Sequence, residues 1–233
     1  MLAALENRLV AVRRKRWAQL LIVNTRFLIG FAFIPSGLKK VLDQPFTDPA
    51  NVGSFHEFLH AFQATGWFYQ FVGVMQLTAA LLLFTQRFAT IGALLAAPIM
   101  TTILMFCWST QVYPTAVAVT LMWVATMALI VWDFSRWRGL FAADLHDHTA
   151  TGPRRAGMDG TPAALDMRLW QACGVAILVL YFASCLLSGE IYRPRGIELH
   201  RPAFYLLPTI AVLPVVTLIV DQRRHRRLTG HRR

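Results

Sequence analysis

Six long apolar segments follow one another along the chain, separated by shorter polar stretches. They run through residues 17–39, 67–85, 88–108, 114–132, 168–188 and 203–220. Each has about 18–23 residues, which is enough for a helix with a rise of 1.5 Å per residue to cross some 30 Å of hydrocarbon. The pattern predicts an all-α, polytopic membrane protein with about six spans.

The charged residues support this interpretation because they are scarce and unevenly placed. They make up 15% of the chain, whereas a soluble domain carries roughly 25%. Between Glu57 and Asp133 there is no acidic residue, and Arg87 is the only lysine or arginine. A water-facing surface of that length would carry charges, so several membrane spans explain the stretch better.

The lengths of the connecting stretches divide the chain into five regions. The first four apolar segments are joined by short connections, so residues 17–132 predict a four-helix transmembrane bundle. Residues 168–220 predict an additional C-terminal transmembrane hairpin, separated from the bundle by a polar cytoplasmic loop, 133–167. Residues 1–16 place apolar side chains at helical spacing among basic ones, which is typical of an amphipathic surface segment. Residues 221–233 form a basic cytoplasmic tail.

Lysines and arginines flank the apolar segments and predict the orientation of the chain. With both termini inside, seventeen of them lie on the cytoplasmic side and five on the outer side. Such a bias predicts a multi-pass protein of a bacterial-type inner membrane with cytoplasmic N and C termini. The net charge of +11 is therefore explained by topology and by attraction to membrane lipids, and we expect no nucleic-acid partner.

One arginine lies inside the first span. Arg26 is about 13 Å past Trp17, and an arginine at that depth normally faces the protein interior or a water-filled cavity. Its side chain could instead extend back to the interface. Gln76, nine residues after Trp67 on a span of opposite direction, reaches a similar depth. We therefore expect a polar binding site near the midplane made of Arg26, Gln76 and Asn24, the alternative for Gln76 being a helix-packing hydrogen bond.

Two stretches resemble the DoxX-like integral membrane family. They are RFLIGFAFIPSGLKKVL (26–42) and GWFYQFVGVMQLTAALLLFTQRFATIGALLAAPIM (66–100). The resemblance covers about residues 18–132, and its matched positions are Arg26, Gly37, Lys39 or Lys40, Gly73 and Gln76. The family usually has an acidic residue where this chain has Gln76. The resemblance implies an integral membrane subunit of a redox system that acts on or with a quinone, or another electron carrier, through a partner protein.

The sequence has no self-contained catalytic motif and so leaves open whether the chain is an enzyme. As an oxidoreductase subunit it would need a protein partner, or a homo-oligomer, and a diffusible carrier such as a quinone. The alternative is a non-enzymatic transporter, assembly factor or docking protein that uses the outer loops or the basic tail. A lipid-processing or isoprenoid-processing enzyme is a third interpretation, weakened by the lack of aspartate pairs.

An H-E-x-x-H pattern occurs at His56, Glu57 and His60. On a helix it places two imidazoles on one face, as zinc binding requires. The pattern lies in the outer segment 51–66, which we predict to be an amphipathic interfacial helix, and no third ligand follows at close range. A plain interfacial helix is therefore the favoured interpretation, and a zinc or other metal site is the alternative.

Cys107 and Cys185 both lie near the outer ends of their spans. A disulfide between them on the oxidising side is one interpretation. Inert buried thiols are the other, and the favoured one.

Overall fold

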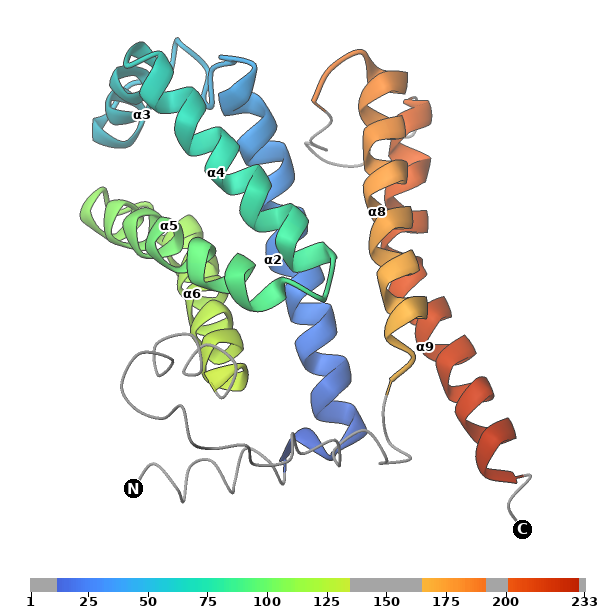
Figure 1. Cartoon of the computed structure of the whole chain (residues 1–233). Coiled ribbons are helices and arrows are strands. Elements are labelled where there is room, and N and C mark those ends of the chain that lie inside the picture. The colour runs from blue at the N-terminus through green and yellow to red at the C-terminus, as the bar shows by residue number, and fades with distance from the viewer. Residues whose placement is uncertain (1–11, 135–164, 192–200, 231–233) are drawn as a thin grey trace, which may run out of the picture.

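The computed structural model describes residues 12–134, 165–191 and 201–230. Within these residues, six helices are long and apolar enough to cross a membrane. The prediction of an all-α, polytopic membrane protein is confirmed. In chain order the elements are α2 (Arg16–Val41), the short α3 (Ser54–Ala64), α4 (Trp67–Phe84), α5 (Ala89–Ser109), α6 (Tyr113–Trp132), α8 (Met167–Ser188), a 3-10 turn (Pro202–Tyr205) and α9 (Leu206–Gly230) (Figure 1).

Five of the six predicted spans begin and end within two residues of the observed helices. The sixth was predicted to end at residue 220, whereas α9 continues to Gly230. The thickness of hydrocarbon limits a span but not the helix, which continues into the basic tail. Most of the predicted N-terminal surface segment and of the loop 133–167 lies outside the described residues.

The first four spans form a closed bundle. Helix α2 packs along α4, α4 on α5 and α5 on α6, and α6 returns to α2. Short turns join α4 to α5 and α5 to α6, and the longer connection 42–66, which contains α3, joins α2 to α4; successive spans run antiparallel (Figure 1). The chain reverses between α4 and α5 within four residues, 85–88, where Gln86 takes a positive φ of 56°.

Two glycines allow α2 and α4 to approach closely. A Cβ atom on Gly73 would lie 2.7 Å from the Cβ of Lys40 and 2.8 Å from the carbonyl oxygen of Gly37. Further along the same pair of helices, a Cβ on Gly30 would lie 2.8 Å from the Phe84 ring. Small residues at helix contacts are the usual means of close packing in membranes. These contacts fix the antiparallel register of α2 against α4.

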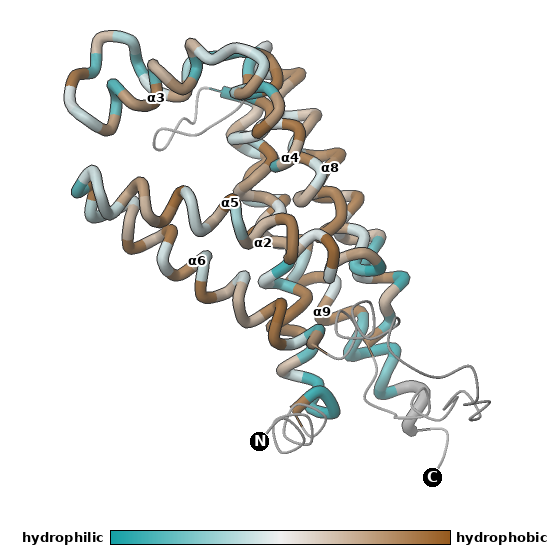
Figure 2. The backbone as a smooth tube through the Cα atoms, turned by 60° about the vertical axis from the view of Figure 1, so that its left-hand side comes forward, coloured by the Kyte–Doolittle hydropathy of each residue, from teal (hydrophilic) through white to brown (hydrophobic). Residues whose placement is uncertain are grey.

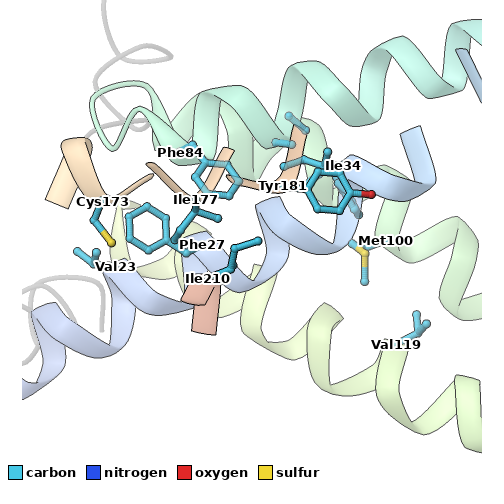
Figure 3. Packing of buried hydrophobic residues seen from close by; sticks show 14 of the residues in the cluster. Val23, Phe27, Ile34, Phe84, Met100, Val119, Cys173, Ile177, Tyr181 and Ile210 are labelled. Carbon is cyan, nitrogen blue, oxygen red and sulfur yellow. The ribbon is translucent and has the colours of Figure 1, made fainter. Parts of the chain in front are cut away.

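The C-terminal hairpin of α8 and α9 packs against the bundle through aromatic side chains. Phe27 of α2 stacks on Phe84 of α4, with ring centroids 5.4 Å apart, and lies 6.2 Å from the ring of Trp170 in α8. Gly174 brings the backbone of α8 against the end of α4, because its Cβ would lie 3.1 Å from the Phe84 carbonyl oxygen. Cys173, Ile177, Tyr181 and Ile210 continue the same core (Figure 3).

The polar residues gather at the two ends of the helices, and the middle is apolar (Figure 2). We call one end the basic end: it comprises the start of α2, the 85–88 turn, Asp133 after α6, the start of α8 and the charged part of α9. The opposite end is the α3 end. Because Arg16 forms an ion pair with Asp221, the start of α2 and the charged part of α9 lie together at the basic end.

Candidate functional site

A buried ion pair lies at the basic end of the bundle. Arg26 of α2 donates from Nη2 to Oδ2 of Asp133 at 2.9 Å and from Nη1 to Oε1 of Gln86 at 3.1 Å. The Thr90 hydroxyl donates to the same Asp133 oxygen at 3.0 Å. Arg26, Gln86 and Asp133 are each less than 5% exposed, and Thr90 is 8% exposed. This cluster, which we call the Arg26 cluster, joins α2, the 85–88 turn, α5 and α6.

Local structure explains why the partners point inward. Asp133 is the C-cap of α6, a position where the helix dipole disfavours a carboxylate. The guanidinium of Arg26 compensates for that unfavourable position, and the first turn of α5, which contains Thr90, is a favourable place for negative charge. Gln86 is held in the turn by a hydrogen bond from its Nε2 to the Leu83 carbonyl at 3.3 Å.

The predicted pairing of Arg26 with Gln76 is wrong. Gln76 accepts a hydrogen bond from Ser36, ten residues beyond Arg26 on α2 and therefore about 15 Å along the helix axis. The prediction measured depth from Trp17 and Trp67 as if both spans began at a membrane face. In the structure the first turns of α2 extend past the end of α4, so Arg26 lies level with Gln86, near one end of the bundle and not at its middle.

Gln76 belongs to a second buried polar group toward the α3 end. The Ser36 hydroxyl lies 3.3 Å from Oε1 of Gln76 and accepts from Nζ of Lys40 at 2.9 Å. The Lys40 ammonium also lies over the rings of Phe46, at 4.6 Å, and Tyr69, at 5.8 Å. Gln76 is 1% exposed and Lys40 is 7% exposed. The helix-packing hydrogen bond that was the alternative for Gln76 is the one observed.

Asn24 is also separated from Arg26. The side chains of residues two apart on a helix point in directions about 200° apart, so Asn24 faces away from the Arg26 side of α2. Asn24 lines a groove between α2 and the α8–α9 hairpin. Its amide donates to the Leu20 carbonyl at 2.8 Å. The groove has a volume of about 770 Å³. Its walls are almost entirely apolar, and they include Phe27, Phe31, Tyr181, Ile210 and Pro214. Asn24 and Thr25 supply polar groups on the α2 side.

Two further ion pairs at the basic end tie the hairpin to the bundle and to itself. Asp221 of α9 pairs with Arg16 of α2 and accepts from the backbone N–H of Asp166 at 3.0 Å. Asp166 caps the start of α8 and pairs with Arg224 at 2.8 Å. Asp133, Asp166 and Asp221 are not among the partners predicted from the sequence. A usable signal existed, because acids are rare in this chain and each of these three lies at the end of a span.

The H-E-x-x-H pattern lies on α3, as predicted, and α3 is amphipathic. Its aromatic face packs toward the bundle, with the Phe58 ring 4.5 Å from that of Phe106. His56 Nδ1 lies 2.6 Å from the Thr47 hydroxyl. His60 lines a separate shallow pocket that also includes Asp43 and Gln63. Among the described residues, no group of three or more His, Cys, Asp or Glu is placed to hold a metal ion.

The less favoured interpretation, a disulfide between Cys107 and Cys185, does not hold in the structure, where both are free thiols. Cys107 is buried in α5, and Cys185 is partly buried in α8, which packs on α9 and α4. The third cysteine, Cys173, is a buried free thiol of α8. The inert-thiol interpretation agrees with these positions.

The Arg26 cluster and the groove differ in chemical character. The cluster neutralises its own charges and holds four elements together, whereas the groove presents an apolar surface that a molecule dissolved in the bilayer could contact.

The chain matches no family model, no curated protein and no solved structure.

Proposed function

We propose that the chain is a DoxX-like integral membrane subunit of a redox system, which binds a quinone or a similarly apolar electron carrier in the groove between α2 and the α8–α9 hairpin. The observation that carries the proposal is the groove itself, about 770 Å³ of apolar and aromatic wall beside two polar side chains. Binding sites for small apolar molecules combine such walls with a few polar groups that fix orientation.

The residues of the groove would bind and orient the carrier. Phe27, Phe31 and Tyr181 present ring surfaces to an isoprenoid tail or a quinone ring. The Asn24 amide donates one N–H to Leu20, and an amide has a second N–H that can donate to a quinone carbonyl. The electrons would be carried by the quinone and exchanged with a partner protein, since the chemistry belongs to the cofactor and the protein supplies its position.

In this proposal the Arg26 cluster is a positioning element and not a quinone ligand. Arg26 and Phe27 are neighbours on α2, so the ion pair that fixes Arg26 against α6 also fixes the turn of α2 that carries Phe27. Phe27 in turn contacts Trp170 of the hairpin. The Arg26 ion pair and the Phe27–Trp170 contact therefore fix the α2 wall of the groove relative to the hairpin wall.

Quinone content tests the proposal. We would purify the full chain in mild detergent, extract bound quinone and compare two variants that each add one large ring. Ala211→Trp fills the groove, whereas Ala118→Trp adds the same ring to a lipid-exposed position of α6. We expect the affinity for quinone to fall about tenfold in Ala211→Trp, which corresponds to about 1.4 kcal/mol. The affinity of Ala118→Trp should stay that of the wild type. Equal binding by both variants would contradict the proposal.

The proposed location is a bacterial-type inner membrane with both termini cytoplasmic. Among the residues whose side chains the structure describes, the basic end carries ten lysines and arginines against three acids. The α3 end carries three lysines and arginines against four acids. Positive charge on the cytoplasmic side is the rule for such proteins. Labelling of cysteines introduced at Arg14 and at Asn51 from either side of the membrane tests this orientation.

One observation favours a second candidate function, that of a docking protein. Helix α9 continues past Asp221 into a charged segment on which Arg223, Arg224 and Arg226 are exposed. A basic helix end that projects from the membrane suits an acidic protein surface. If this is the function, Arg223→Gln with Arg226→Gln would abolish co-purification of a protein partner, and Ala211→Trp would not.

A further inference from the structure

The hairpin and the bundle meet at the basic end along a narrow junction. The side chain of Gln171 in α8 donates to the carbonyl of Thr85 in the 85–88 turn at 3.0 Å. One turn further, Gly174 lies against the end of α4. Below these contacts, toward the headgroups, each element carries one exposed arginine: Arg87 in the turn and Arg168 at the start of α8.

Among the residues that the structure describes, no carboxylate of this end pairs with either arginine. The three whose side chains are described are Asp133, Asp166 and Asp221. Their ion pairs are with Arg26, Arg224 and Arg16 respectively. Two exposed guanidinium groups on adjoining elements repel one another, and an anion that contacts both would relieve that repulsion.

The neighbours of the two arginines identify the kind of anion. Arg87 precedes Phe88, which is 46% exposed and whose ring lies 5.4 Å from the Arg87 guanidinium. Arg168 follows Met167, which is 40% exposed. Exposed apolar side chains beside cations, at the ends of membrane-spanning helices, mark the boundary between hydrocarbon and headgroups. An anion that lies at this depth with apolar chains attached is an anionic phospholipid.

We infer that Arg87 and Arg168 form a binding site for the phosphate of an anionic phospholipid, and that this lipid strengthens the junction between the bundle and the α8–α9 hairpin. Arginine binds phosphate oxygens with two parallel hydrogen bonds, which makes such a bridge specific as well as electrostatic. Basic pockets between membrane helices are known settings for anionic headgroups. The inference does not depend on the quinone proposal, because neither Arg87 nor Arg168 lines the groove.

Thermal unfolding of the full chain in mild detergent tests this phospholipid-binding site. Phosphatidylglycerol, phosphatidylcholine or inorganic phosphate would be added to the wild type and to the Arg87→Gln/Arg168→Gln double variant. We expect phosphatidylglycerol alone to raise the unfolding midpoint of the wild type, and high salt to reduce that rise. The double variant should lose most of the rise, whereas Lys39→Gln at the α3 end should keep it.

Three results would overturn the inference. They are an equal rise with phosphatidylcholine, an equal rise with inorganic phosphate, and a full rise with phosphatidylglycerol in the double variant. If the double variant does not fold, Arg87→Lys and Arg168→Lys keep the charge but lose the paired donors. Phosphatidylglycerol should then raise the unfolding midpoint of each variant less than that of the wild type. An unchanged rise in both variants would contradict the proposed binding site.

Discussion

Arg26 and Asp133 are 107 residues apart in the chain and form an ion pair of 2.9 Å in which both side chains are at most 5% exposed. The pair closes the bundle, because it joins the first span to the end of the fourth. Taking two charges out of water is costly, and the pair compensates for that cost only while both partners are present. It is therefore a sensitive point of the fold.

Removing one partner should be far more harmful than removing both. We expect Arg26→Leu to lower the free energy of unfolding by about 3–5 kcal/mol, because it leaves the Asp133 carboxylate buried without its cation. Arg26→Leu with Asp133→Leu should recover a large part of that loss. Reversible unfolding in mixed micelles measures both.

The exposed pair Arg224–Asp166 is the matched control. Its side chains are 59% and 34% exposed, and exposed pairs contribute at most about 1 kcal/mol. Arg224→Leu should therefore change stability little. A loss for Arg26→Leu as small as that for Arg224→Leu would contradict the importance of the buried pair.

Arg26 and Gln76 should behave as independent sites. They lie about 15 Å apart along α2 and α4 and have different partners, and substitutions at such distances usually add to within about 0.5 kcal/mol. We expect Arg26→Leu/Gln76→Leu to show the sum of the two single losses in the same unfolding measurement. A coupling energy above about 1 kcal/mol would restore the direct pairing that the sequence first suggested.

The close approach of α2 and α4 should make Gly73 intolerant of even one added carbon. Gly73→Ala would place a methyl group 2.7 Å from the Lys40 Cβ, and overpacking of this kind costs about 1–3 kcal/mol. Val74→Ile adds one carbon to the neighbouring position, which is 49% exposed, and should be nearly neutral. Equal stability of the two variants would show that the helices can separate at this point.

All three cysteines should be present as thiols. Mass spectrometry of protein denatured and alkylated without reduction should find Cys107, Cys173 and Cys185 all modified. Modification of Cys173 alone would instead indicate a Cys107–Cys185 disulfide.

The spans were predictable because hydropathy is a local property of the sequence. A bilayer requires about 20 apolar residues in succession, and the start of α4 at Trp67 or the end of α6 at Trp132 can be located from neighbouring residues alone. The continuation of α9 to Gly230 was missed for the same reason, since hydropathy marks the membrane boundary and not the end of the helix.

The partner of Arg26 was not predictable from depth, because depth was measured from tryptophans at span ends, and α2 extends past α4. A deep arginine needs a carboxylate, and few acids lie at the ends of spans on the basic side. The sequence therefore narrows the possible partners to residues such as Asp133, although only the fold shows that the end of α6 returns to α2.

The groove was not predictable, because it depends on how the hairpin packs against α2. Asn24 was predicted to be a site residue because it precedes Arg26, and only the direction of its side chain shows that it belongs to this groove.

The most direct test of the account is to map where a photoreactive quinone attaches to the full chain in membranes. The groove predicts labelled peptides from α2 between Leu21 and Pro35, or from the facing parts of α8 and α9, with labelling reduced by excess unmodified quinone. Labelling confined to α5 and α6, or labelling that excess quinone does not reduce, would contradict quinone binding in the groove.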